Sequence, residues 1–290
     1  MTRTSGGGGY EKAAHLYDLF DQKPNIEFFF HYAGQAGETL DVGAGTGRVA
    51  IPLAERGVRV VCVEPSPAMR LEFEKKLTRR PDLASKLEII AGDARSFDVD
   101  RTFRAAFLSG TFDHLLNDEE RVASLENIGR HLAPGGILVF DVFLGLMKDS
   151  ALSPAGVVSV GDREFRRFVG GRVRPDRTKE TILVFEEHQD GRLIERIEER
   201  SLVGIVDRGA VLRLLRTTGF EVRREWGDYD FAEYQEGDPL LVVQAAKVGR
   251  GDGEGKSPEG AERPKEDGRA AATLNGPACE DEGTPREVRQ

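Results

Sequence analysis

Residues 38–48 of the chain read ETLDVGAGTGR, so a short apolar run with an embedded acid leads into a glycine-rich turn. A helical pattern begins directly after the turn, and the order strand, turn, helix builds a βα unit. Glycines lack a Cβ, so the backbone of such a turn lets a ligand approach closely. A second apolar run, 58–63, ends in Glu64. A carboxylate about twenty residues beyond such a turn is typical of a ribose-binding acid in doubly wound folds. The two runs predict a site for an adenosine-type ligand.

The spacing of the glycines separates two classes of adenosine ligand. The dinucleotide pattern G-x-G-x-x-G needs its third glycine three residues after the second, and Arg48 stands at that position. Asp41 precedes the turn, where a carboxylate would repel a pyrophosphate but attract a ligand that carries an ammonium group. These residues favour a cationic adenosine ligand over a dinucleotide.

The stretch DVGAGTG, residues 41–47, resembles the first motif of class I S-adenosylmethionine-dependent methyltransferases. In that family the acid lies near the methionine moiety, commonly through its amino group, and the glycines line the cofactor. The resemblance therefore implies S-adenosylmethionine as the cofactor. It implies cofactor-binding roles for Asp41, Gly43, Ala44, Gly45 and Gly47.

Two later stretches resemble further motifs of the same family. Glu64, followed by PSPAM, resembles the second motif, in which the acid binds both ribose hydroxyls through charge-assisted hydrogen bonds. The stretch GDAR at 92–95 resembles the third motif, whose Asp receives the exocyclic adenine amine. The alternatives are a surface acid that begins a helix for Glu64 and a cap or turn residue for Asp93. The residues that these two motifs add to the expected cofactor site are Glu64, Pro65, Met69, Asp93 and Ala94.

The exit of the fourth predicted strand, residues 108–116, falls where the family places residues against the transferring methyl group. Ser109 and Gly110 are expected to line the cofactor. His114 is the first choice as general base, because a neutral imidazole near pH 7 can take a hydroxyl proton. The alternative for His114 is a helix-start histidine packed beside Leu115. Methyl transfer needs alignment in a water-poor site above all, so a base is optional.

Two tyrosines complete the expected site. Tyr17, with Tyr10, is expected to close over the cofactor, as aromatic residues of N-terminal helices do in similar enzymes; simple packing of an amphipathic helix is the alternative. Tyr229 follows the strand predicted at 220–226 and is the second catalytic candidate, with a solvated turn as the alternative. His15 and His188 rank behind His114.

The composition of the chain limits the kinds of partner and cofactor that we expect. The formal net charge is −9 with no long Lys/Arg block, so neither nucleic acid nor an anionic membrane is an expected partner. The two cysteines predict no disulfide framework, and neither they nor Asp113 and Asp118 form a convincing metal site, so no metal is expected. No apolar run approaches the roughly twenty residues of a membrane span, and the first residues lack an apolar signal region, which favours a cytoplasmic protein. We expect a monomer or homodimer.

The predicted fold is α/β, with a doubly wound, mostly parallel seven-stranded sheet, helices on both faces and an inserted antiparallel β-layer near the active site. Asp190-Gly191 is a hairpin signal within that layer. Residues 1–9 are expected to be flexible, 10–248 to form the methyltransferase domain with a β-rich substrate-covering insertion at 144–207, and 249–290 to be a disordered acidic tail. The strands are expected near 39–42, 58–63, 87–90, 103–108, 137–143, 157–160, 164–169, 180–188, 192–203, 220–226 and 240–247.

The leading functional hypothesis is methyl transfer from S-adenosylmethionine to an oxygen or nitrogen of a small molecule. The N-P-P-Y type of motif found in nucleic-acid and protein amide N-methyltransferases is absent after the fourth predicted strand, which favours a small acceptor. Two alternatives stay open: a nicotinamide-dependent oxidoreductase, which Asp41 and Arg48 disfavour, and a non-catalytic S-adenosylmethionine-binding protein.

Overall fold

The computed structural model of the 290-residue chain describes residues 10–20 and 25–248. Two expectations lie outside the described residues: the flexible start at 1–9 and the disordered tail at 249–290.

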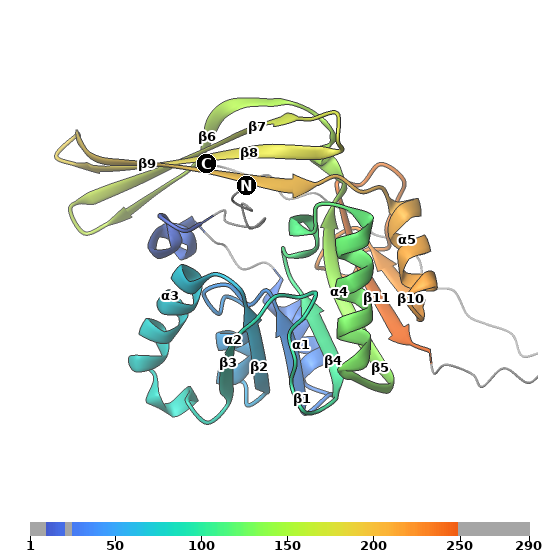
Figure 1. Cartoon of the computed structure of the whole chain (residues 1–290). Helices are drawn as coiled ribbons and strands as arrows, with labels where there is room; N and C mark the ends of the chain where they lie inside the picture. Colours follow the sequence, from blue (N-terminus) through green and yellow to red (C-terminus); the bar gives the residue numbers. More distant parts are fainter. Residues whose placement is uncertain (1–9, 21–24, 249–290) are drawn as a thin grey trace, which may run out of the picture. The chain divides into compact units, whose positions relative to one another are not determined.

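The larger of two sheets contains seven strands in the order β10-β11-β5-β4-β1-β2-β3. Neighbouring strands are parallel except where β11 takes part, since β11 runs antiparallel to both β5 and β10. This order confirms the predicted doubly wound, mostly parallel sheet (Figure 1). The strands of this sheet are β1 (Glu38–Val42), β2 (Arg59–Glu64), β3 (Leu87–Ala91), β4 (Phe103–Leu108), β5 (Leu132–Phe143), β10 (Phe220–Trp226) and β11 (Leu240–Lys247).

Helices cover both faces of this sheet (Figure 1). On one face pack α1, α2 and α3, where Phe29, Leu53 and Phe73 are fully buried. On the other face pack α4 and α5, which bury Leu125 and Leu215. Burial on both faces explains why the central strands read as continuous apolar runs. The helices are α1 (Ile26–Ala33), α2 (Ala50–Glu55), α3 (Pro67–Thr78), α4 (Asp118–Arg130) and α5 (Arg208–Thr217), with short 3-10 turns η1 (Ala14–Phe20), η2 (Pro81–Leu83), η3 (Phe112–His114) and η4 (Leu144–Met147).

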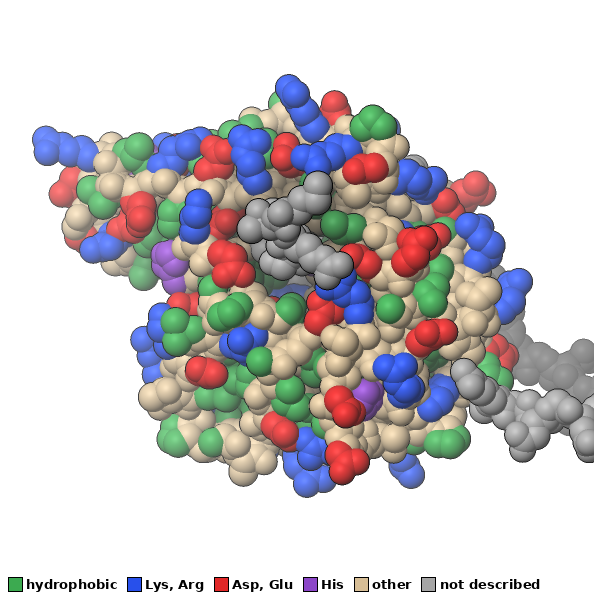
Figure 2. Space-filling model, viewed as in Figure 1, with side chains coloured by type: hydrophobic (Ala, Val, Ile, Leu, Met, Phe, Trp, Pro, Cys, Tyr) green, Lys and Arg blue, Asp and Glu red, His purple; other side chains and the backbone are tan. Residues whose placement is uncertain are grey.

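The smaller sheet is antiparallel, has the strand order β6-β7-β8-β9 and lies across the carboxyl ends of the parallel strands (Figure 1). Asp190 and Gly191 join β8 to β9 with φ values of +50° and +75°, the left-handed pair that the Asp-Gly signal predicts. Acidic and basic side chains are interspersed over the outer surface of this sheet (Figure 2), so it presents no patch of a single sign. Its strands are β6 (Ser150–Val160), β7 (Arg163–Val173), β8 (Thr178–Gln189) and β9 (Arg192–Gly204).

Several boundaries differ from the sequence-based expectation. The helix expected directly after the glycine-rich turn begins only at Ala50, because Gly45 and Gly47 adopt left-handed φ values of +57° and +82° that a right-handed helix excludes. Strand β6 begins at Ser150 rather than at residue 157, since pairing with β7 overrides the poor strand propensity of its first residues. Strand β5 likewise begins at Leu132 through pairing with β4.

The N-terminal segment is wedged between the two sheets. The carboxylate of Glu199, a buried residue of β9, accepts hydrogen bonds from the backbone N–H groups of Lys12 and Ala13, the latter at 3.0 Å. On the other side, the hydroxyl of Thr46 donates to Asp18 Oδ1 at 2.7 Å. These contacts tie η1 to both the inserted sheet and the glycine-rich turn. In the described part of the chain, no helix has the length and apolar character of a membrane-spanning segment.

We predict that Gly47→Ala destabilises the protein by about 2–4 kcal/mol. The new Cβ would lie 2.3 Å from the ring of Phe73, at a φ of +82° that L-residues rarely adopt. The matched control is Gly57→Ala, at a φ of +93° with no atom within 4 Å of the added Cβ, for which about 1 kcal/mol is expected. Urea denaturation measures both, and equal losses would show that the Phe73 contact does not matter.

Candidate functional site

A cavity opens at the carboxyl ends of β1, β2 and β4, beneath the N-terminal segment. This is the edge where ligands bind in open α/β sheets. The lining comes from the glycine-rich turn, the ends of three further strands, the first turn of α4 and the N-terminal segment. Its members are Tyr10, Tyr17, Gly43, Gly45, Glu64, Pro65, Ser66, Met69, Asp93, Ala94, Arg95, Ser109, Gly110, Thr111, His114, Leu115 and Glu120.

Glu64 is fixed at the end of β2 by two backbone donors. Its Oε2 accepts from the N–H of Gly45 at 2.8 Å, and its Oε1 accepts from the N–H of Ser66 at 2.8 Å. Burial raises the pKa of this carboxyl group, and the two backbone hydrogen bonds oppose that rise. Each carboxylate oxygen has a second lone pair, so Glu64 can still accept hydrogen bonds from a ligand.

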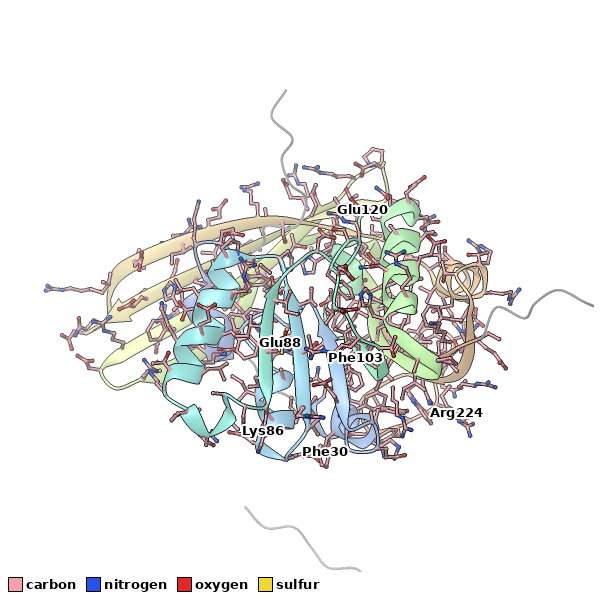
Figure 3. The ribbon with its side chains drawn as sticks, turned by 60° about the horizontal axis from the view of Figure 1, so that its bottom comes forward. Phe30, Lys86, Glu88, Phe103, Glu120 and Arg224 are labelled. Atoms are coloured by element: carbon pink, nitrogen blue, oxygen red, sulfur yellow. The ribbon has the colours of Figure 1, made fainter. Side chains whose placement is uncertain are left out.

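Asp93 lies at the opposite wall of the cavity and is held by Arg95. Both of its oxygens accept from the guanidinium group, at 2.7 and 2.6 Å, and this pairing lowers the pKa of the carboxyl. Arg95 also donates to Glu120 Oε1 at 2.8 Å. The guanidinium therefore bridges β3 to α4 across this end of the cavity, and Glu120 is labelled at that end of α4 in Figure 3.

His114 ends η3 and faces the same cavity. Its Nδ1 is buried and has no hydrogen-bond partner among the described residues. Burial lowers the pKa of its imidazole, which keeps the ring neutral near pH 7 and able to accept a proton. His114 therefore lies where the sequence placed it, and its role as general base stays a prediction.

The N-terminal segment forms the roof. Tyr10 and Tyr17 both line the cavity, and their rings meet edge to face with centroids 4.7 Å apart. Burial raises the pKa of Tyr10. Two aromatic rings over a cavity exclude water from it and offer a surface for a planar ligand group.

Asp41 takes a place that the sequence did not indicate. It is buried within β1 rather than on the cavity lining, and its Oδ2 has no hydrogen-bond partner among the described residues. Burial raises the pKa of Asp41 to about 7, with Arg48 opposing that rise and Glu64 and Asp141 adding to it. Ala44 and Gly47 also lie outside the lining and act through packing: the N–H of Ala44 donates to Val63 O at 3.1 Å.

Tyr229 also lies outside the cavity lining. Its hydroxyl donates to Oδ2 of the fully buried Asp141 at 2.8 Å, and Asp141 Oδ1 accepts from the N–H of Gly110 at 2.6 Å. Arg48, at the position where a dinucleotide turn has glycine, donates to Ser109 Oγ at 2.6 Å. Tyr229 therefore supports the wall of the cavity rather than reaching into it.

Of the sixteen residues that the sequence favoured for this site, Tyr10 and eleven others line the cavity. Ser66, Arg95, Thr111, Leu115 and Glu120 line it as well without having been proposed. Ser66 and Arg95 stand within the motif stretches PSPAM and GDAR, so their neighbourhood was a usable signal. Glu120 had no such signal, because only the packing of α4 brings its first turn to the cavity. The eleven residues are Tyr17, Gly43, Gly45, Glu64, Pro65, Met69, Asp93, Ala94, Ser109, Gly110 and His114.

Comparison with known proteins gives a consistent result. Residues 39–136 match the family of methyltransferase domains. The cypemycin N-terminal methyltransferase of a Streptomyces species is 39% identical over 104 residues, which are 35% of this chain and 40% of that protein. An uncharacterized methyltransferase of Bacillus thuringiensis (strain Al Hakam) is 31% identical over 148 residues, 47% of this chain and 66% of that protein. The match thus spans about half the length of these relatives.

Solved structures share the fold across the larger part of the chain. The sugar N-methyltransferase KedS8 from Streptoalloteichus has a TM-score of 0.66 at 21% identity, covering 86% of this chain and 98% of that one. CalS10, an amino pentose methyltransferase from Micromonospora echinaspora solved with bound S-adenosylmethionine, has a TM-score of 0.60 at 22% identity, covering 83% and 93%. The fold that the sequence predicts, including its inserted sheet, is thereby confirmed.

The buried carboxyl of Asp113 leads to a prediction on stability. Burial raises its pKa from 3.8 to about 8, and its Oδ1 has no hydrogen-bond partner among the described residues. The folded state thus binds this proton more tightly than the unfolded state, so the stability it contributes is complete below about pH 4 and is lost as the pH rises to about 8. We expect the thermal midpoint to fall over this range.

Asp113→Asn is expected to reduce that slope and to raise the midpoint at pH 8 by about 5 °C relative to the wild type. The amide oxygen of Asn can still accept from the N–H of Phe143, which lies 3.2 Å from Asp113 Oδ2. The control is Asp100→Asn, at an exposed position, which should leave the slope unchanged. Differential scanning fluorimetry from pH 5 to 8 measures both, and an unchanged slope in Asp113→Asn would contradict the prediction.

Proposed function

The chain carries a methyltransferase domain at residues 39–136 in the class I S-adenosylmethionine-dependent fold, and on that premise we propose that it methylates an amine nitrogen of a small molecule. The observation that carries the proposal is one cavity that brings together a fixed carboxylate, Glu64, and the imidazole of His114, whose Nδ1 has no hydrogen-bond partner among the described residues.

The residues of the cavity fit S-adenosylmethionine, which supplies an electrophilic methyl group when bound. Glu64, held by two backbone N–H groups, matches a ribose diol because its free lone pairs can accept two hydroxyl donors. Gly45 and Gly110 both have left-handed φ values with no atom within 4 Å of an added Cβ, so their backbone leaves room for the cofactor. Asp93 would receive the adenine amine beside its Arg95 partner.

Buried acids match the positive charge of the cofactor. Asp41 has an unpartnered Oδ2 directly behind the glycine-rich turn, and Asp141 lies behind Gly110. Buried carboxylates act through a medium of low dielectric constant, where charges are felt more strongly than in water. A sulfonium and an ammonium group next to these walls would keep the carboxylates ionised. The proposed role of Asp41 is therefore electrostatic, since Asp41 does not line the cavity.

The class of acceptor rests on the relatives. The cypemycin enzyme is named for an N-terminus, KedS8 for a sugar nitrogen and CalS10 for an amino pentose. We take an amine on a small molecule as their shared chemistry. An amine is protonated near pH 7 and must lose a proton before its lone pair can attack, which gives His114 a task. We further propose that the inserted sheet, within residues 144–207, covers the acceptor and excludes water.

In this mechanism the protein aligns the reactants and excludes water from the site, and His114 removes a proton from the acceptor. The tyrosines of the roof and the end of β4 hold the reactants in line, which supplies most of the rate. The imidazole of His114 takes the proton from the acceptor ammonium group and returns it to solvent after transfer. When bound, S-adenosylmethionine would supply the electrophilic methyl group to the nitrogen lone pair that this proton removal leaves free.

We predict that the protein binds S-adenosylmethionine with micromolar affinity and that Glu64→Ala weakens this binding about 30-fold. The loss corresponds to about 2 kcal/mol. This is the order expected when two hydrogen bonds to a charged acceptor are lost and water replaces part of them. Isothermal titration calorimetry measures the affinity. Glu88→Ala, at an exposed acid of the neighbouring β3, is the control and should bind as the wild type does.

Binding of NAD in place of S-adenosylmethionine would contradict the proposal and favour the nicotinamide-dependent oxidoreductase. Binding of S-adenosylmethionine without turnover on a panel of amino sugars, peptides with free N-termini and small phenols would favour a non-catalytic binder.

We predict that His114→Asn lowers kcat on an amine acceptor by about a hundredfold, the lower range for loss of a general base. Cofactor affinity should change less than threefold, since His114 is assigned to the acceptor proton. His15→Asn, at an exposed position of η1, is the matched control and should be fully active. Formation of S-adenosylhomocysteine measures the rate.

The pH profile separates a base from a packing role. Burial lowers the pKa of His114, so in the wild type the acid limb that it contributes should lie below pH 6.5, and His114→Asn should lack that limb. A uniform loss of rate at every pH would instead assign His114 to packing.

A further inference from the structure

A second hollow lies on the face of the seven-stranded sheet that α1 covers, where β4, β5, β10 and β11 extend past the helix. It encloses about 520 Å³, a size within the range of small-molecule sites. None of its residues lines the cofactor cavity. Its lining consists of His31, Tyr32, Gln35, Ala36, Arg104, Ile137, Arg224, Trp226, Phe231 and Gln244, and we call it the aromatic groove.

Four rings form the walls of the aromatic groove. The ring of Phe231 lies 5.7 Å from Trp226 and 5.1 Å from His31, measured between centroids. Tyr32 packs beside them, and the indole Nε1 of Trp226 donates to its hydroxyl at 3.3 Å. Such rings present flat apolar faces on which a planar ligand group can stack.

The charge of the groove is opposite to that of the whole protein. The chain has a formal net charge of −9, yet the lining contains two arginines and no acid. Arg104 and Arg224 are exposed, come from β4 and β10, and make no hydrogen bond or ion pair with any described residue. Most arginines elsewhere in this structure pair with a nearby carboxylate, as the adjacent Arg223 does with Glu221 at 2.8 Å. The two arginines of the groove are thus available to an anion.

Backbone strain marks the same place. Phe231 has a φ of +66°, a left-handed conformation that bulky residues rarely adopt, and its side chain is 36% exposed. The loop around it is held by Asp228, whose Oδ1 accepts from the backbone N–H groups of Asp230 and Ala232 at 2.8 and 3.0 Å. A strained backbone that keeps a large ring at the surface is a feature of ligand clamps.

We propose that the aromatic groove is a binding site for a small ligand that combines a planar ring with an anionic group. The ring packs against the aromatic walls of the groove, and the anion pairs with Arg104 and Arg224, whose guanidinium groups match carboxylate, sulfonate or phosphate oxygens. Such a ligand differs from the amine acceptor and the cationic cofactor of the proposed reaction.

The groove and the cofactor cavity share no lining residue. Figure 3 shows Arg224 at the rim of the sheet near β10, and Glu120, which lines the cavity, at the end of α4 that faces the inserted sheet. The proposed ligand therefore does not compete with S-adenosylmethionine for space, and the two can be tested independently.

The single tryptophan of the chain, Trp226, gives a direct reporter. Protein that contains 5-fluorotryptophan should show one fluorine resonance, and titration with naphthalene-2-sulfonate should shift it in a saturable way. Arg224→Gln and Arg104→Gln should each raise the Kd of the probe at least fivefold. Arg223→Gln, the neighbour on β10 that pairs with Glu221, is the matched control and should leave the Kd unchanged.

Three results would overturn the proposal. The first is the absence of a saturable shift. The second is equal affinity for uncharged 2-naphthol, which would reduce the groove to an apolar patch. The third is loss of the probe in Glu64→Ala, which would place it in the cofactor cavity. Thermal midpoints of the exposed arginine variants within about 2 °C of the wild type will confirm that each is folded.

Discussion

The buried carboxylate of Asp141 is the constraint on which the site depends. A buried charge is costly unless it is paired and hydrogen-bonded, so each of its neighbours is held in place. Its oxygens receive the N–H of Gly110 and the hydroxyl of Tyr229, and Ser109 connects it to Arg48. One carboxylate thereby joins the end of β4, the loop after β10 and the glycine-rich turn. These hydrogen bonds therefore fix the position of the cavity wall at the end of β4.

The two sheets divide the work of building the cavity. The parallel sheet supplies the floor, because the ends of its strands and the turns that follow them meet at one edge. The inserted sheet supplies the roof indirectly: Glu199 of β9 holds the start of the N-terminal segment, and that segment brings Tyr10 and Tyr17 over the cavity. From the opposite side, Thr46 of the glycine-rich turn donates a hydrogen bond to Asp18 of the N-terminal segment. A change in either sheet would therefore reach the cavity through η1.

Two regions of the molecule differ in the ionisable groups that they contain. Buried acids surround the cofactor cavity, where Asp41, Asp113 and Asp141 all have raised pKa values because burial disfavours their charged forms. A cationic ligand would offset that cost. The aromatic groove instead offers Arg104 and Arg224 without a carboxylate. The negative net charge of the protein would have suggested only the preference for a cationic ligand.

The sequence by itself determined the features that neighbouring residues control. The glycine spacing at 43–47 and the Asp190-Gly191 turn each require a local backbone geometry, and the stretches around the glycines and Glu64 supplied many of the residues that line the cavity. Only the tertiary structure decided that Asp41 is buried, that Tyr229 binds Asp141, and that Arg104 and Trp226 share a groove. These contacts join segments tens of residues apart, and side-chain packing, which no local pattern encodes, selects them.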